Sequence, residues 1–379
     1  MRKAMVSVIL AAALSTTGMT VLADEDTIKV GALFNLTGGQ ASIDTPSYQG
    51  FKLKADEINA AGGINGKQVE VISYDGKTDQ ATCANNAKKM IDVDGCVVVS
   101  GFSDSNYALA AGAVAQEKQV PFVITGATLP DLCDQIGDYA FMVPFGDDTC
   151  AYAAAEYAYA ELGSKCYMMT DQSMEFTKTL AECFQERFEE LGGEIVGTDN
   201  YMNGDPDFSA QIDKFMNDDG GADFMFFSSV PDDAGPLVLQ YRDKGVELPI
   251  ISGDGFDTPL VAEVAGDQAH DVYVSTHCSY TNEAENVQNF VTAYKDAYGT
   301  EPENAFAALG YDAMDLIGQA LAAVDDPTDT AAIREALENT KDFKGVTGTI
   351  SYTAESHKPD KTASILELVD GKFQFITEE

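Results

Sequence analysis

The sequence is poor in basic residues, and this shortage excludes two classes of partner. Its 379 residues include 23 Lys and Arg against 62 Asp and Glu, which gives a formal net charge of −39. Nucleic acids and anionic lipid surfaces are bound mainly by Lys and Arg that neutralise phosphate charge. Because the acidic residues are spread along the whole chain, we predict a solvated acidic surface that binds neither nucleic acid nor a membrane surface.

Residues that commonly build metal and redox sites are also few. The three histidines, His270, His277 and His357, are too scattered for a histidine metal site. Seven cysteines are present, but no CxxC motif, which excludes a zinc ribbon and a thioredoxin motif. An odd number leaves at least one thiol without an intramolecular partner, and the sequence leaves the pairing of the others open. We expect no metal and no cofactor.

Long apolar runs are missing beyond the N-terminus. Two basic residues precede the apolar stretch 5–14, and small or aliphatic residues at positions 21 and 23 form a cleavage site. A membrane anchor would need about 20 continuous apolar residues, and the polar residues within 15–20 interrupt this run. We therefore predict that residues 1–23 are a signal peptide cleaved before Asp24, and that the exported protein is not inserted in a membrane.

Short apolar runs alternate with helix-length amphipathic segments, which is the pattern of parallel α/β sheets. The first such unit has predicted strands at 28–33, 69–74, 96–100 and 122–125, with helices at 48–61, 82–93 and 106–117. A second unit begins near Thr149 and runs, through a strand at 250–252, to a strand at 272–275. Three further helices follow, and we expect them to return to the first unit. This order predicts two lobes, with chain crossings near 142–145, 276–280 and 345–348.

Two loops of the first unit present hydroxyl groups where strands end, which is where open α/β sheets bind ligands. Ser105 ends the segment Gly101-Phe102-Ser103-Asp104-Ser105, which resembles a nucleophile elbow but lacks its second glycine and a histidine partner motif, so a serine hydrolase is disfavoured. Ser105 either caps the next helix or helps that helix terminus hold a carboxylate. The loop Gly126-Ala127-Thr128 follows the neighbouring strand, so Thr128 would lie beside Ser105.

Asp254 follows a strand of the second unit and is flanked by Gly253 and Gly255. Aspartate between glycines is common in plain turns. The alternative is a binding role, because a carboxylate enclosed in a cleft attracts a ligand cation strongly.

Six motifs in order along the chain resemble periplasmic binding proteins of the leucine/isoleucine/valine type. They are Ile28-Lys29-Val30-Gly31, the segment 56–66, Val120-Pro121 with Gly126-Ala127-Thr128, Asp207-Phe208-Ser209, Gly253-Asp254-Gly255 and the segment 307–313. The resemblance covers essentially the whole mature chain. It implies an α/β fold with two Rossmann-like lobes, whose parallel-rich central sheets are joined by a three-crossing hinge (the type I fold). Lobe 1 would comprise residues 24–143 and 280–346, and lobe 2 residues 144–279 and 347–379.

The resemblance also implies a function. The protein would be a monomeric periplasmic receptor of an ABC importer, not an enzyme, with a membrane permease as its partner. It would bind an α-amino acid with a branched-chain or other small apolar side chain between the lobes and close by hinge motion. An amide, a urea or an aromatic carboxylate is the alternative ligand class.

By the same resemblance, individual residues acquire expected roles. Ser105 and Thr128 stand where family members hold the ligand carboxylate, and the Gly126 carbonyl, next to Ala127, and Asp254 stand where they hold the ammonium. Asp254 replaces the Glu of leucine-binding members and is one methylene shorter. The aromatic candidates for pocket walls, which are alternatively core residues, are Phe102, Tyr107, Phe176, Phe256 and Phe306.

The acidic charge fits this ligand class. A strongly negative field does not steer an anion toward a cleft, so a zwitterion or a cation is the better match. The same excess resembles the surfaces of proteins from saline habitats, where salt screens self-repulsion. We therefore expect stability that increases with salt.

Overall fold

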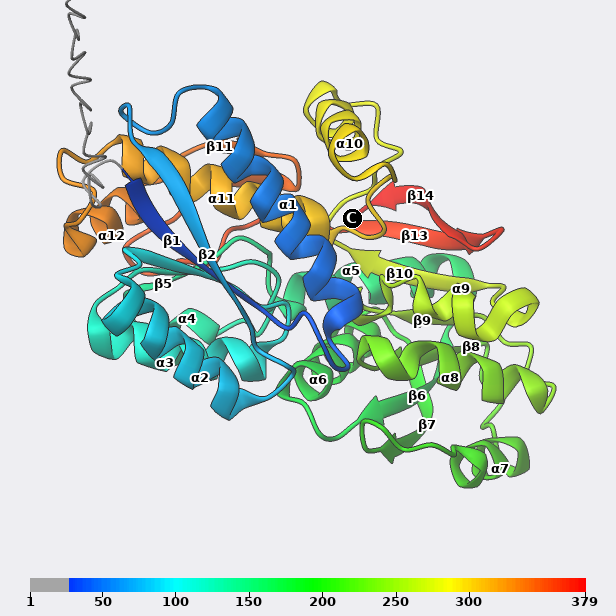
Figure 1. Ribbon diagram of the computed structural model, residues 1–379. Helices are drawn as coiled ribbons and strands as arrows, with labels where there is room; N and C mark the ends of the chain where they lie inside the picture. The colour runs from blue at the N-terminus through cyan, green and yellow to red at the C-terminus, as the bar shows by residue number, and fades with distance from the viewer. Residues whose placement is uncertain (1–26) are drawn as a thin grey trace, which may run out of the picture.

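The computed structural model describes residues 27–379, which form two α/β lobes with parallel-rich sheets, as predicted (Figure 1). The predicted signal peptide, residues 1–23, lies outside the described residues. Among residues 27–379, none of the helices combines the length and the apolar character that a membrane span requires.

The first lobe is built on five parallel strands in the spatial order β2–β1–β3–β4–β5. They are β1 (Thr27–Phe34), β2 (Gln68–Asp75), β3 (Val98–Gly101), β4 (Phe122–Ile124) and β5 (Ala140–Met142). The strands β3, β4 and β5 are short and buried along their whole length, as expected when helices cover both faces of a parallel sheet.

Helices cover both faces of this sheet, so the first lobe has one core on each side. Helices α1, α11 and α12 enclose one core, and α2, α3 and α4 enclose the other. The bounds are α1 (Ala41–Ala60), α2 (Gln80–Lys89), α3 (Ser105–Lys118), α4 (Leu132–Ile136), α10 (Glu285–Tyr298), α11 (Phe306–Ala322) and α12 (Thr330–Glu338). The late helices therefore return to the first lobe, as the sequence predicted.

The crossing of α1 over α11 depends on two glycines (Figure 1). A Cβ atom on Gly50 would lie 1.8 Å from the carbonyl oxygen of Ala307, and one on Gly310 would lie 1.8 Å from that of Ser47. The helices come this close because neither carries a side chain at the crossing.

Helix α1 begins at Ala41, seven residues before the predicted start at 48. Pro46 lies inside the helix and has no N–H to donate, so the carbonyl of Ser42, four residues earlier, loses its helical partner. That carbonyl accepts a hydrogen bond from Asn304 Nδ2 at 2.9 Å instead. This hydrogen bond from Asn304, in a distant loop, allows the helix to continue through Pro46, although a proline often marks the end of a helix.

The second lobe is built on seven strands in the order β14–β13–β10–β9–β8–β6–β7. The first five in the sequence are parallel, and β13 and β14 are antiparallel to their neighbours. They are β6 (Lys165–Asp171), β7 (Glu194–Tyr201), β8 (Phe224–Ser228), β9 (Ile250–Ser252), β10 (Val272–Thr276), β13 (Ser364–Val369) and β14 (Lys372–Glu378).

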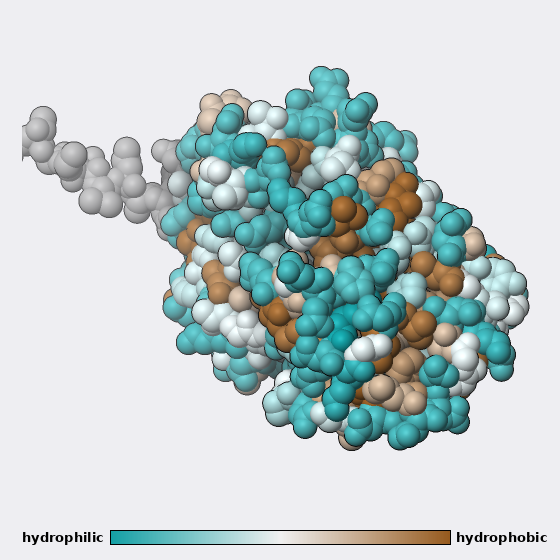
Figure 2. Space-filling view, turned by 90° about the vertical axis from the view of Figure 1, so that its right-hand side faces the viewer, coloured by the Kyte–Doolittle hydropathy of each residue, from teal (hydrophilic) through white to brown (hydrophobic). Residues whose placement is uncertain are grey.

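This sheet also separates two cores. Helices α5 and α6 enclose one, and α7, α8 and α9 enclose the other. The bounds are α5 (Asp147–Tyr157), α6 (Glu175–Glu190), α7 (Ser209–Asn217), α8 (Pro231–Asp243) and α9 (Leu260–Ala265). The face of the molecule in Figure 2 is largely hydrophilic, with hydrophobic side chains in separate groups, which fits the acidic, solvated surface expected from the sequence.

The chain passes between the lobes three times. Residues 143–146 link β5 to α5, and residues 277–284 link β10 to α10. The third crossing was expected at 345–348, but these residues form the turn of a hairpin, β11 (Phe343–Gly345) and β12 (Gly348–Ile350). The chain enters the larger sheet only at β13, and before that His357 O accepts a hydrogen bond from Met142 N in β5. The third crossing therefore follows His357. Gly345 and Gly348, which we expected in a crossing, lie in the tight turn of the hairpin instead.

The seven cysteines, whose pairing the sequence left open, are all free thiols in the structure. Burial raises the pKa of Cys150 and Cys166 well above the ordinary value, so these two thiols behave as apolar core groups.

Candidate functional site

Ser105 lies at the carboxyl end of β3 and is the first residue of α3. The cap of this helix is Asp104, not Ser105, because the Asp104 carboxylate accepts the hydrogen bond from Asn106 N at 2.9 Å. Ser105 Oγ instead accepts a hydrogen bond from Leu129 N at 3.2 Å, which joins the loops after β3 and β4. The hydroxyl of Ser105 is buried and still has a proton to donate.

The loop after β4 places small and polar groups next to Ser103. A Cβ atom on Gly126 would lie 2.9 Å from Ser103 Oγ and 2.8 Å from the ring of Phe306, so only glycine fits between them. Ala127 and Thr128 are buried in the same loop. Ser103 Oγ is buried and has no hydrogen-bond partner among the described residues.

Asp254 follows β9 in the second lobe and is paired with His277. Its Oδ2 lies 2.9 Å from His277 Nε2, and the two side chains are 3% and 1% exposed, respectively. Asp254 Oδ1 is also buried but has no hydrogen-bond partner among the described residues. A buried polar atom without a partner needs an explanation, and a bound ligand supplies one.

Asp147, the first residue of α5, is a second acidic group at this place. Its backbone N–H donates to Thr128 O at 2.7 Å, while both of its carboxylate oxygens are buried without a full hydrogen bond. Burial raises the pKa of Asp147 well above its ordinary value, and the charge of Asp254 adds to the rise. The Thr128 hydroxyl opposes the rise, although its geometry falls short of a full hydrogen bond.

Together these contacts bring the predicted polar residues of both lobes into one group. Ser105, at the start of α3, is hydrogen-bonded to the loop that carries Thr128, and Thr128 O accepts a hydrogen bond from Asp147 N. The charge of Asp254 in turn raises the pKa of Asp147. One side of the group offers hydroxyls and the other offers carboxylates. Such an arrangement can hold a small molecule that carries both an anionic and a cationic end.

The five aromatic candidates divide into two sets. The ring of Phe306 lies 5.8 Å from the His277 ring, and Phe176 lies beside Gly255, next to Asp254. The second set is Phe102, Tyr107 and Phe256. All five rings, including those of Phe306 and Phe176, pack in the hydrophobic cores of the lobes.

Two residues of this group were not predicted from the sequence. His277 was considered only as a metal ligand, although its position directly after β10 satisfies the same strand-end rule that identified Asp254. Asp147 begins a helix, where an acidic residue is common because it complements the helix dipole. Its nearness to Asp254 arises from the chain crossing and leaves no local signal. Among residues 27–379, no group of His, Cys, Asp and Glu side chains is arranged to hold a metal ion.

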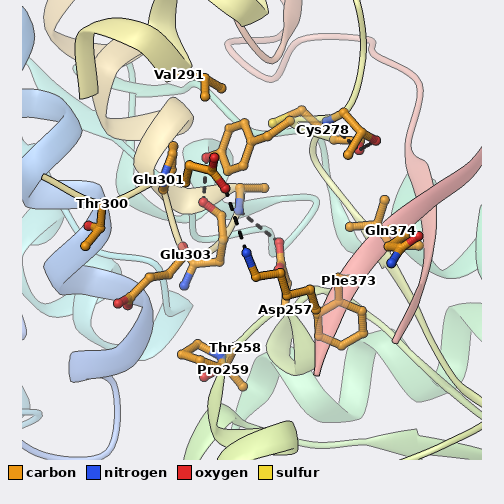
Figure 3. A pocket seen from close by; sticks show the side chains of 18 of the residues that line it. Asp257, Thr258, Pro259, Cys278, Val291, Thr300, Glu301, Glu303, Phe373 and Gln374 are labelled. Carbon is orange, nitrogen blue, oxygen red and sulfur yellow. Dashed lines mark hydrogen bonds and ion pairs between the residues drawn. The ribbon is translucent and has the colours of Figure 1, made fainter. Parts of the chain in front are cut away.

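A cavity of about 790 Å³ lies next to this group, between the loop after α10 and the β13–β14 hairpin (Figure 3). None of the ten predicted site residues lines it. Asp257 and Thr258 form one side, and Glu301 and Glu303 lie across from them. We place the candidate site at Asp254 rather than in this cavity, because the free carboxylate oxygens gather there.

Hydrogen bonds on the floor of the cavity join the two lobes. Asp257 Oδ2 accepts from Thr276 Oγ1 at 2.7 Å within the second lobe and from Ala305 N at 3.0 Å in the first. Thr258 Oγ1 lies 3.1 Å from Ser42 Oγ in the first lobe. The turn that carries Asp254 therefore also contacts the opposite lobe.

Comparisons with known proteins bear on the family and the fold of the chain. The sequence profile of a family described as periplasmic binding protein matches residues 27–372. The Leu/Ile/Val-binding protein homolog 1 of Brucella abortus is 27% identical over 99% of this chain and 100% of its own. A crystal structure of the branched-chain amino acid transporter substrate binding protein LivJ from Streptococcus pneumoniae, in complex with isoleucine, is 32% identical with a TM-score of 0.87, over 93% of this chain and 99% of that one. A solute binding protein of an ABC transporter from Rhodopseudomonas palustris, in complex with 3,4-dihydroxybenzoic acid, is 26% identical with a TM-score of 0.81, over 94% of this chain and 98% of that one.

Proposed function

The chain belongs to the periplasmic binding protein family, with the type I fold of its branched-chain amino acid receptors, and from this premise we propose that it binds an α-amino acid between its lobes. The ligand would carry a branched-chain or other small apolar side chain. The protein would be exported to the periplasm and would deliver its ligand to the permease of an ABC importer. The relatives named above are binding proteins, which at the level of the family fits a receptor rather than an enzyme.

The observation that carries this proposal is the pair of buried carboxylates with free oxygens, opposite the hydroxyls of the first lobe. A ligand ammonium has three N–H groups, and Asp254 Oδ1 together with the Asp147 oxygens can accept them. The ligand carboxylate would take the hydroxyls of Ser105 and Thr128 and nearby loop amides. Charge-assisted hydrogen bonds of this kind are the strong ones in a site shielded from water.

Hinge closure follows from this division of contacts. A ligand shifts an equilibrium between open and closed states only when it binds one of them better. An amino acid that touches hydroxyls on one lobe and carboxylates on the other makes its full set of contacts only when the lobes are together. The hydrogen bonds from Ala305 N to Asp257 and from Thr258 to Ser42 would then form as part of the same closure.

A second candidate ligand is an aromatic carboxylate, which the Rhodopseudomonas relative binds. Such a ligand has no ammonium to satisfy Asp254 and Asp147, and its own negative charge would lie near theirs. The free acidic oxygens therefore favour the amino acid.

Isothermal titration calorimetry with three probes tests the proposal. We expect L-isoleucine to bind, and L-isoleucinamide and 3,4-dihydroxybenzoate to bind at least tenfold more weakly, because each lacks one of the two charged ends. Binding of the benzoate in preference to every amino acid tried would replace the proposal by the second candidate. The absence of binding by all three classes would overturn both.

A further inference from the structure

His277 occupies a junction between the ligand acid, the hinge and the opposite lobe. It directly follows β10, in the second crossing between the lobes, and is buried. Its ring lies 4.1 Å from the ring of Phe145 in the first crossing and 5.8 Å from that of Phe306 at the start of α11. The first contact is tilted by 31° and the second is edge-to-face at 76°. These two aromatic neighbours limit the rotation of the imidazole, so that the ring presents Nε2 to Asp254 in a fixed direction.

The protonation of His277 follows from its partner. A carboxylate can only accept a hydrogen bond, so the proton of the neutral ring belongs on Nε2, which donates to Asp254 Oδ2 at 2.9 Å. Burial lowers the pKa of His277, and the hydrogen bond to Asp254 only partly opposes this, so the ring is neutral at neutral pH. The neutral ring therefore brings no positive charge of its own next to Asp254.

A cationic partner would act differently. Lys or Arg at this place would cancel the charge of Asp254 and reduce its attraction for a ligand ammonium. A neutral imidazole fixes one carboxylate oxygen without cancelling the charge, and it leaves Oδ1 without a partner.

We propose that His277 is a positioning residue of the binding site, which holds Asp254 through Oδ2 so that Oδ1 is directed to the ammonium of the ligand. This inference rests on the proposed function, because it presumes an ammonium ligand between the lobes. His277 would act on the ligand only through Asp254. Its ring contacts with Phe145 and Phe306 would connect the ammonium site to the first crossing and to the first lobe.

The test compares two probes that differ only at the group bound by Asp254. L-isoleucine and its 2-hydroxy analogue share the carboxylate and the side chain, but only the first carries an ammonium. Calorimetry on the whole protein gives the ratio of their affinities, and this ratio reports the ammonium site specifically. A purely structural role for His277 would weaken both probes equally and leave the ratio unchanged.

Two substitutions separate the ring from its N–H group. His277→Phe keeps an aromatic ring between Phe145 and Phe306 but removes the donor, and we expect the preference for L-isoleucine to fall roughly 10- to 100-fold, the range for a hydrogen bond to a charged group. His277→Gln can place an amide N–H where Nε2 lies, and we expect it to keep most of the preference. His357→Phe is the matched control, because His357 is a buried ring stacked on Phe141 and has no contact with Asp254.

The outcomes distinguish this inference from the function on which it rests. If wild-type protein binds L-isoleucine and His277→Phe keeps the wild-type preference, or loses affinity for both probes equally, the positioning role is overturned and the proposed function stands. If wild-type protein binds no α-amino acid, the proposed function fails and the inference falls with it. Nitrogen-15 NMR of the ligand-free protein gives an independent reading: the Nε2–H tautomer is expected, and the Nδ1–H tautomer would overturn the positioning role.

Discussion

The two lobes contribute opposite chemistry to the candidate site. The first lobe supplies the hydroxyls of Ser103, Ser105 and Thr128, and its nearby carboxylates, Asp44 and Asp104, accept backbone hydrogen bonds. The second lobe supplies the carboxylates of Asp147 and Asp254, which have oxygens without a partner among the described residues. Both sets are buried, so water screens the carboxylate charges only weakly. We expect this contrast to give a bound amino acid its direction, with the carboxylate toward the first lobe and the ammonium toward the second.

The contrast also predicts unequal sensitivity to substitution. Removing one member of a buried charge pair leaves the other charge uncompensated, which costs more than the loss of one neutral donor. Substitutions on the second-lobe side should therefore weaken binding more than substitutions on the first-lobe side.

Asp254→Ala should have the largest effect and weaken the binding of L-isoleucine by ~100-fold, because the ligand ammonium would be buried without its main partner. Isothermal titration measures the loss. Asp267→Ala, at an exposed acid of the same lobe, is the control and should bind normally. Unchanged affinity in Asp254→Ala would end the assignment of the ammonium site.

Thr128→Val should weaken binding by roughly tenfold, since it removes one hydroxyl from the neutral side. The loss should be smaller for L-isoleucinamide, which lacks the carboxylate that this hydroxyl would bind. Thr292→Val, on the exposed face of α10, serves as the control. An equal loss for both ligands would show that Thr128 does not contact the ligand carboxylate.

Stability and affinity should change in opposite directions with pH. Burial raises the pKa of Asp44 to about 6, of Asp104 to about 7 and of Asp257 to about 6. Between the unfolded value of 3.8 and these values the folded protein binds more protons than the unfolded chain, so stability is lost as pH rises through 6 to 7. The melting temperature of the free protein should be higher at pH 5 than at pH 7.5 by roughly 5 °C.

Ligand affinity should instead decrease when the pH is lowered from 7.5 to 5. A ligand ammonium favours the ionised form of Asp147, and burial raises the pKa of this carboxyl. His277 contributes to stability with the opposite sign, since burial lowers its pKa, but it is one group against several acids. Scanning calorimetry at pH 5 and pH 7.5 measures the melting temperature, and titration calorimetry at the same two pH values measures the affinity for the ligand. A melting temperature that decreases from pH 7.5 to pH 5 would contradict the first, and affinity that increases would contradict the second.

Salt should have the smallest effect on binding and should distinguish the surface from the site. A net charge of −39 produces self-repulsion that molar salt screens, so the melting temperature should increase by a few degrees between low and molar potassium chloride. Affinity for L-isoleucine should change less than threefold, because the carboxylates of the site are buried. A melting temperature that does not increase with salt would contradict the expected surface repulsion.

The sequence predicted what depends on local periodicity. The strand at 250–252 and the alternation of strands with helices were correct, because parallel strands are short apolar runs and helices repeat every 3.6 residues. The start of α1 was wrong, since the contact from Asn304 that supports the helix beyond Pro46 comes from a distant loop. The expected crossing at 345–348 was wrong for a related reason, as two glycines fit a turn as well as a linker.

For the candidate site too, the sequence predicted what depends on local position and not what depends on contacts between distant segments. Asp254, Ser105 and Thr128 follow strands and could be selected by a rule that needs only strand ends. The pairing of His277 with Asp254, and the approach of Asp147 to both, depend on how the crossings bring separate loops together, and no spacing in the sequence encodes that distance.

The proline inside α1 has a consequence for how the chain tolerates mutation. The acceptor that Pro46 frees is a main-chain carbonyl, at residue 42, and every amino acid has one. Genetic drift at position 42 can change the hydroxyl that meets Thr258, yet it cannot delete the bond from Asn304. The anchor therefore depends on Pro46 and on the side chain of Asn304 but not on the residue at position 42, so this end of the helix should remain in place while position 42 diverges.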